Sequence, residues 1–241
     1  MKTVNNKNRT ILAVAAHADD LDFGCSASIA KWTKEGALVY YLILTDGSKG
    51  SKDLNIKKEE LIQIRKDEQT KAAKSLGVRE VFFAGFTDGE LTNSYEVKRE
   101  IVKAIRKLKP YTVITTDPTF VYNSQFGFIN HPDHRICGQA TLDSIHPFSK
   151  NFRSFPDLLE QGLQPHAISE VLLLNFTEGN YIVDITETFD KKIAALRMHK
   201  SQTGHIDLKT FRERLEKRAN MIGQKINAKY AEAFVKISLH Y

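Results

Sequence analysis

Apolar runs typical of buried strands alternate with longer helical patterns along most of the chain, and this alternation constrains the fold more than any other feature. The expected strands are Thr10–Ala16, Ala37–Leu44, Val78–Ala84, Tyr111–Thr116, Glu170–Leu174 and Tyr181–Ile185. The expected helices are Phe23–Lys34, Lys57–Leu76, Tyr95–Leu108, Pro132–Ile145, Thr188–His199 and Leu208–Lys225. Because parallel strands need crossover helices, the pattern predicts an α/β fold with a mostly parallel sheet covered on both faces. No repeat or linker divides the 241 residues, which favours one domain over 1–241.

Polar side chains follow several of the expected strands at the point where each strand ends. His17, Asp19 and Asp20 follow the first strand, Asp46 the second and Asp88 the third. The carboxyl ends of parallel strands meet at one edge of a sheet, and ligands of such folds bind there. The chain has no glycine-rich phosphate motif after its first strand. An acidic loop in that place favours a cation instead.

Two clusters of histidine and aspartate carry the chemistry. They are His17-Ala18-Asp19-Asp20 and His131-Pro132-Asp133-His134, and neither contains cysteine. Two histidines and one carboxylate are a suitable protein shell for a hydrolytic zinc ion that keeps a position open for water. One aspartate of the first cluster can then bind the ion while the other serves as a general base. One histidine of the second cluster can bind the ion while the other stabilises an oxyanion.

Composition and charge restrict the remaining possibilities. The formal net charge is +6, but basic residues alternate with acids, as in Lys57–Glu60, which is typical of a solvated helix face. We therefore expect no nucleic-acid partner. Cys25 and Cys137 are expected to be buried free thiols. No apolar run is long enough for a signal peptide or a membrane span, so a cytoplasmic location is expected, with homo-oligomer formation left open.

The chain resembles the LmbE-like, or PIG-L-type, metal-dependent N-acetylglucosaminyl de-N-acetylases. That family has His-Pro-Asp-Asp after the first strand and a distant His-Pro-Asp-His. Here the motifs are His17–Asp20, with Ala18 in place of proline, and His131–His134. The likeness continues in Asp22–Cys25, Thr45–Gly50, Arg65 with Glu68, Leu76-Gly77, Asp88–Leu91 and Ala195–Gln202.

The resemblance implies a Rossmann-like three-layer sandwich and a metal site. Its ligands would be His17, Asp20 and His134. Zinc is the expected ion, and the same donor set accepts other divalent ions such as Fe²⁺ or Mn²⁺. The substrate implied is a small molecule, an N-acetylglucosamine-type amino sugar or its conjugate.

Roles for five further residues also follow from the resemblance. Asp19 would be the general base. His131, oriented by Asp133, would stabilise the oxyanion or protonate the leaving amine. Arg65 and Asp88 would contact the sugar.

Purely structural interpretations compete with these roles. An aspartate of the first cluster can cap a helix, Arg65 and Glu68 have the spacing of a surface ion pair, and Asp88 can shape a turn. Two other functions also fit the same fold. One is a non-catalytic sugar or nucleotide-sugar binding module, and the other is a metal amidase for a different N-acyl substrate.

Overall fold

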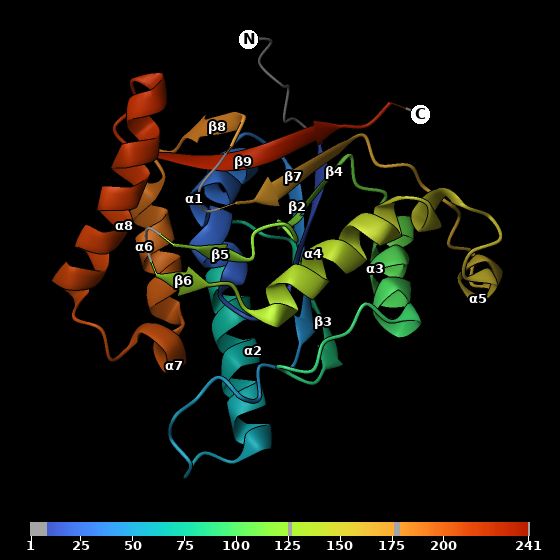
Figure 1. Cartoon of the computed structure of the whole chain (residues 1–241), viewed down its shortest axis with the longest axis horizontal. Helices are drawn as coiled ribbons and strands as arrows, with labels where there is room; N and C mark the ends of the chain where they lie inside the picture. Colours follow the sequence, from blue (N-terminus) through green and yellow to red (C-terminus); the bar gives the residue numbers. More distant parts are fainter. Residues whose placement is uncertain (1–8, 125–126, 176–178, 241) are drawn as a thin grey trace.

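The computed structural model describes residues 9–124, 127–175 and 179–240. Within these residues, seven strands form one sheet in the order β3-β2-β1-β4-β7-β9-β8 (Figure 1). The strands are β1 (Thr10–Ala15), β2 (Leu38–Thr45), β3 (Glu80–Phe86), β4 (Thr112–Thr116), β7 (Glu170–Leu174), β8 (Tyr181–Asp184) and β9 (Ala231–Ser238). A separate antiparallel hairpin consists of β5 (Tyr122–Asn123) and β6 (Phe128–Ile129).

Helices cover both faces of the sheet. They are α1 (Asp20–Lys34), α2 (Lys58–Ser75), α3 (Tyr95–Leu108), α4 (Pro132–Ile145), α5 (Pro156–Glu160), α6 (Phe189–Met198), α7 (Lys200–Thr203) and α8 (Leu208–Gly223). Short 3₁₀ turns lie at Phe148–Lys150 and Gln224–Ile226. Helices α3 and α4 pack on one face, and α1, α2, α6 and α8 pack on the other (Figure 1). The expected three-layer α/β sandwich is confirmed.

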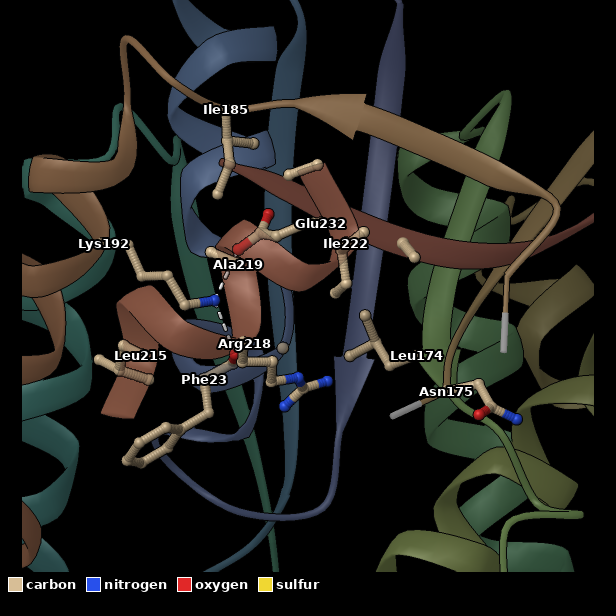
Figure 2. Close-up of a pocket in the computed structure, with 13 residues that line it drawn as sticks. Phe23, Leu174, Asn175, Ile185, Lys192, Leu215, Arg218, Ala219, Ile222 and Glu232 are labelled. Atoms are coloured by element: carbon tan, nitrogen blue, oxygen red, sulfur yellow. Dashed lines mark hydrogen bonds and ion pairs between the residues drawn. The ribbon is translucent and has the colours of Figure 1, made fainter. Parts of the chain in front are cut away.

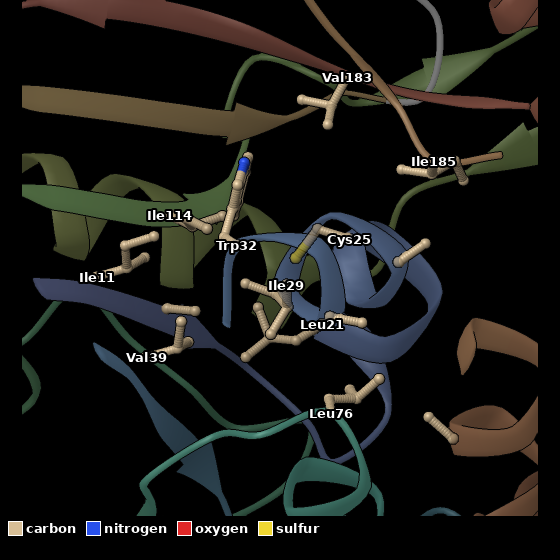
Figure 3. Packing of buried hydrophobic residues seen from close by; sticks show 14 of the residues in the cluster. Ile11, Leu21, Cys25, Ile29, Trp32, Val39, Leu76, Ile114, Val183 and Ile185 are labelled. Carbon is tan, nitrogen blue, oxygen red and sulfur yellow. The ribbon is translucent and has the colours of Figure 1, made fainter. Parts of the chain in front are cut away.

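Alternate residues of β1 enter the two halves of the core. Ile11 and Ala13 face α1, where Cys25, Ile29 and Trp32 pack against them in one cluster (Figure 3). Their neighbours Leu12 and Val14 belong to the cluster beneath α3 and α4, which also holds Cys137. A central strand that is buried on both faces explains why its sequence is a continuous apolar run. Both cysteines are buried free thiols, as expected.

Four neighbouring pairs of strands are parallel, as the alternation predicts: β1 with β2, β2 with β3, β1 with β4, and β4 with β7. Most element boundaries differ from expectation by one to three residues. The third strand begins at Glu80 rather than Val78, because the left-handed Gly77 ends the preceding helix and the chain turns before pairing with β2. The first helix begins at Asp20 rather than Phe23. The sequence Glu178-Gly179-Asn180 also predicts a turn between the last two expected strands, and its first residue, Glu178, lies outside the described residues.

Strand β9 was not expected from the sequence, and it makes the sheet mixed. It runs antiparallel to both β7 and β8. Its apolar pattern is interrupted by Glu232, whose carboxylate is buried and accepts a hydrogen bond from Lys192 Nζ of α6 at 2.6 Å. Figure 2 shows this pair at a small pocket beside the first turn of α1, also lined by Phe23 and Leu174. The buried groups of Glu232 and Lys192 thus pair with each other, and this allows Glu232 to stand at a strand position where the pattern requires an apolar residue.

The parallel arrangement brings the ends of β1, β2, β3 and β4 to one edge of the sheet, where the His/Asp clusters lie. Among the described helices, none combines the length and the apolarity needed to cross a membrane.

Candidate active site

His17 lies at the centre of the site, directly after β1. Its Nε2 is 3.2 Å from Asp133 Oδ2 and 3.2 Å from Asp88 Oδ1. Its Nδ1 points the other way and is 3.2 Å from His134 Nε2 and 3.6 Å from Asp20 Oδ2. The first strand, the loop after β3 and the start of α4 therefore meet around one buried imidazole.

The far side of His134 is also hydrogen bonded. Asn130 Oδ1 lies 2.9 Å from His134 Nδ1, and Asp20 Oδ1 lies 3.0 Å from His134 Nε2. An amide oxygen only accepts, so Asn130 places the proton of the neutral ring on Nδ1. The two carboxylates beside His17 likewise place its proton on Nε2. In its neutral form each histidine thus turns an unprotonated nitrogen toward the other, with the Asp20 carboxylate beside both.

This donor set fits a divalent metal ion. Two imidazole nitrogens and a carboxylate converge, and each imidazole donates its remaining N–H to an oxygen, as metal-binding histidines generally do. Ligand atoms of His17, His131 and His134 all lie within 4.8 Å of one another, and so do those of His17, Asp88 and Asp133. The structure therefore contains a His/Asp cluster able to hold a metal ion.

Electrostatics at the cluster favour a positive charge. Burial alone would lower the pKa of His17, but hydrogen bonds to Asp133, Asp20 and Asp88 outweigh it and raise that pKa to about 12. The pKa of Asp88 is lowered to about 2, since the bonds and charge of His17 outweigh its desolvation. The carboxylates that stabilise a proton on His17 also stabilise a metal cation that displaces this proton.

Asp133 contacts two histidines of the site through different atoms. Its carboxylate contacts His17 and accepts from Gly89 N and Leu91 N at 2.7 and 3.3 Å. Its backbone amide donates to His131 Nδ1 at 3.2 Å. Asp133 thus contacts His131, the residue expected to be oriented by it, through its main chain, because His131 is the N-cap of α4.

That bond determines what His131 can donate. With Nδ1 accepting, the proton of the neutral ring is on Nε2. Burial and the neighbouring charge of His17 lower the pKa of His131, so the ring is neutral near pH 7. His131 is exposed, and its ring centroid lies 4.8 Å from that of His17. The neutral ring of His131 therefore places an N–H donor beside the His/Asp cluster.

Asp19 is the N-cap residue of α1 and has a left-handed backbone, with φ of 93°. Its side chain makes no capping hydrogen bond to the described amides of the helix, so capping does not account for this carboxylate. Arg65 Nη2 lies 3.7 Å from Asp19 Oδ1. Burial and the adjacent charge of Asp20 raise the pKa of Asp19.

The surface-pair interpretation of Arg65 and Glu68 is wrong. Both are buried, and the Arg65 guanidinium donates to Ala18 O at 2.7 Å and Gly47 O at 3.3 Å. Glu68 accepts from the amide and the hydroxyl of Ser201. Asp46 shapes the turn after β2, since its Oδ1 accepts from the amides of Ser48 and Asp88.

Asn130 and Gln69 are site residues that the sequence reasoning did not identify. Asn130 directly precedes the second motif and lies one helical turn before His134. Gln69 lies one turn after Arg65 on α2, and its Oε1 accepts from the amide of Asp19 at 2.9 Å. Spacing of i to i+4 from a motif residue is the signal that indicates both.

The fold is that of LmbE-like deacetylase structures. Diacetylchitobiose deacetylase of Pyrococcus horikoshii, solved with its inhibitor MPG, superposes with a TM-score of 0.87 at 32% identity, over 95% of this chain and 84% of that chain. Diacetylchitobiose deacetylase of Thermococcus kodakarensis is 35% identical over 201 residues, which cover 82% of this chain and 71% of that protein. A probable N-acetyl-alpha-D-glucosaminyl L-malate deacetylase 2 of Bacillus cereus is 28% identical over 200 residues, 81% of this chain and 84% of that protein.

The family model that matches is PIG-L, GlcNAc-PI de-N-acetylase, over residues 12–145. This range contains both His/Asp clusters. The chain belongs to the PIG-L family, as its motifs predict.

Proposed function

We propose that this protein is a zinc-dependent hydrolase that removes the N-acetyl group from an N-acetylglucosamine-type amino sugar or its conjugate. The observation that carries the proposal is the convergence of His17 Nδ1, His134 Nε2 and the Asp20 carboxylate. Beside them lies the carboxylate of Asp19, which makes no capping hydrogen bond to the described amides of α1. The activity named for the P. horikoshii and T. kodakarensis relatives supports the substrate class.

His17, Asp20 and His134 would hold the ion. When bound, a zinc ion lowers the pKa of a water toward about 7 and polarises the acyl carbonyl. Asp88 and Asp133 keep the proton of His17 on Nε2, and Asn130 keeps that of His134 on Nδ1. These three side chains therefore prepare the unprotonated nitrogens that a cation requires.

Proton transfer falls to Asp19 and charge stabilisation to His131. Asp19 accepts a proton from the attacking water, and its raised pKa suits a group that must hold this proton and then release it to the leaving amine. His131 donates its Nε2–H to the carbonyl oxygen as negative charge develops there. One amide and one water then give acetate and a protonated amine. Arg65 and Asp88 are proposed to contact the sugar.

The test is hydrolysis of N,N′-diacetylchitobiose and N-acetylglucosamine by the zinc-loaded chain. We expect acetate and free amine to appear in equal amounts from at least one of the two sugars. An N-propionyl glucosamine run alongside distinguishes a deacetylase from an amidase of broader acyl range. Saturable binding of either sugar with no acetate released by the zinc-loaded chain would contradict the proposal and favour a binding module.

Asn130 provides a prediction about the metal site. Asn130→Leu is expected to weaken zinc affinity about 10- to 100-fold, because the orientation and tautomer of His134 are no longer fixed. Asn130→Asp keeps an oxygen that accepts from His134 and places its second oxygen where Nδ2 donates to Phe120 O, so it should bind zinc more tightly than Asn130→Leu. Competition with a zinc chelator measures both affinities. Equal affinity of Asn130→Leu and wild type would show that Asn130 has no part in the metal site.

A further inference from the structure

The peptide group that joins Ala18 to Asp19 is held at both of its polar ends by side chains of α2. Arg65 Nη2 donates to the carbonyl oxygen of this peptide at 2.7 Å. Its N–H donates to Gln69 Oε1 at 2.9 Å. Arg65 and Gln69 are four residues apart, so they project from the same face of the helix. Two side chains of one helix thus fix the plane of a single peptide, and we call this pair the peptide clamp.

The clamped peptide sets the direction of the Asp19 side chain. Its rotation changes φ of Asp19, and that angle is 93°. A non-glycine residue in the left-handed region costs about 1–3 kcal/mol unless its surroundings impose the conformation. The clamp supplies that restraint next to the first residue of α1, so the Asp19 carboxylate stays out of the capping position.

The orientation of the Gln69 amide is itself fixed. Gln69 Nε2 donates to Asp22 Oδ2 at 2.8 Å. His199 Nε2 lies 2.8 Å from the same oxygen, and the carboxylate of Asp22 raises the pKa of His199 in spite of its burial. The backbone N–H of Asp19 can only donate, so the amide must present its oxygen to Asp19 and its NH₂ to Asp22. Gln69, Asp22 and His199 are 0%, 0% and 1% exposed, so bulk solvent does not compete for either bond.

We propose that Gln69 is a positioning residue for catalysis, which acts through the clamped peptide to hold Asp19 in the geometry that proton transfer requires. Asp22 and His199 complete the arrangement by fixing the amide of Gln69. The inference rests on the proposed role of Asp19 as the base. It assigns to Gln69 no contact with substrate or metal.

The first test is Gln69→Met, which keeps the length of the side chain and removes both hydrogen bonds. We expect kcat for acetate release to fall about 100-fold, the size of effect that a small misplacement of a reacting group produces. KM and the zinc content per chain should stay at the wild-type values. Gln63→Met is the matched control, since Gln63 is exposed on the same helix and pairs only with Asp67 among the described side chains. It should leave kcat unchanged.

A polarity swap tests the same bonds with a second variant. Gln69→Glu alone places a carboxylate against Asp22 and should lower kcat at least as much as Gln69→Met. Adding Asp22→Asn restores one donor and one acceptor between the two positions, so kcat should recover in the double variant. If Gln69→Met does not fold, the comparison of Gln69→Glu with the double variant tests the proposal in its place. A double variant whose kcat does not recover overturns the proposal.

Wild-type kcat per zinc-loaded chain in Gln69→Met would overturn the role of Gln69. A lowered Tm together with that kcat is what a purely structural residue gives. Asp19→Asn is measured in the same series. If it is inactive while Gln69→Met is fully active, the clamp has no catalytic role and the proposed function stands. If Asp19→Asn is itself fully active, the proposed function fails.

Discussion

Asp19→Asn is expected to lower kcat for acetate release by about 10²- to 10⁴-fold while the chain keeps its zinc. The carboxamide has nearly the same size and the same backbone conformation is open to it, but it cannot accept a proton from water. Because the Asp19 side chain does not cap α1, the free energy of unfolding should change little. Acetate release and metal content, measured on the same preparation, check the prediction.

Asp67→Asn is the control for this variant. Asp67 is an exposed aspartate of α2, and the same chemical change there should leave kcat at the wild-type value. If Asp19→Asn hydrolyses the sugar as fast as Asp67→Asn, Asp19 is not the base. If Asp19→Asn loses its zinc together with its activity, Asp19 contributes to holding the ion and the division of roles between Asp19 and Asp20 is wrong.

Asp20→Ala is expected to abolish both zinc retention and activity. The Asp20 carboxylate lies beside His17 and His134 at once, so its removal takes away the one anionic group among the three proposed ligands. Asp20 Oδ2 also accepts from the amide of His17 at 2.8 Å, so the loop after β1 loses a restraint in the variant. After dialysis, wild type should keep about one zinc ion per chain and the variant almost none, by elemental analysis. A variant that still binds one ion per chain would exclude Asp20 from the ligand set.

Most of the parallel sheet could be predicted from the sequence because its strands are buried on both faces. Such strands appear as continuous apolar runs, and the polar residues after them mark the edge where the site lies. The same reasoning fails for β9, where the buried carboxylate of Glu232 is compensated by Lys192, forty positions away in the chain. Pattern reasoning detects an apolar face, but it cannot detect a charge that is neutralised by a distant partner.

The candidate site, too, could be predicted only in part from the sequence. Motif spacing identifies the residues that meet at the cluster, because each motif is local in sequence. It does not reveal which atoms face one another. The carboxylate of Asp133 contacts His17 of the other motif, and only its amide contacts His131. Arg65 has the spacing of a surface pair, and only the packing of α2 against the loop after β1 turns its guanidinium onto Ala18 O.

The proposed zinc-dependent deacetylation is tested most directly by a zinc titration of the metal-stripped chain, with acetate release from N,N′-diacetylchitobiose recorded at each addition. We expect no activity in the stripped chain, followed by a rise in proportion to bound zinc that levels off at about one ion per chain. Acetate release by the stripped chain at the rate of the loaded chain would contradict it.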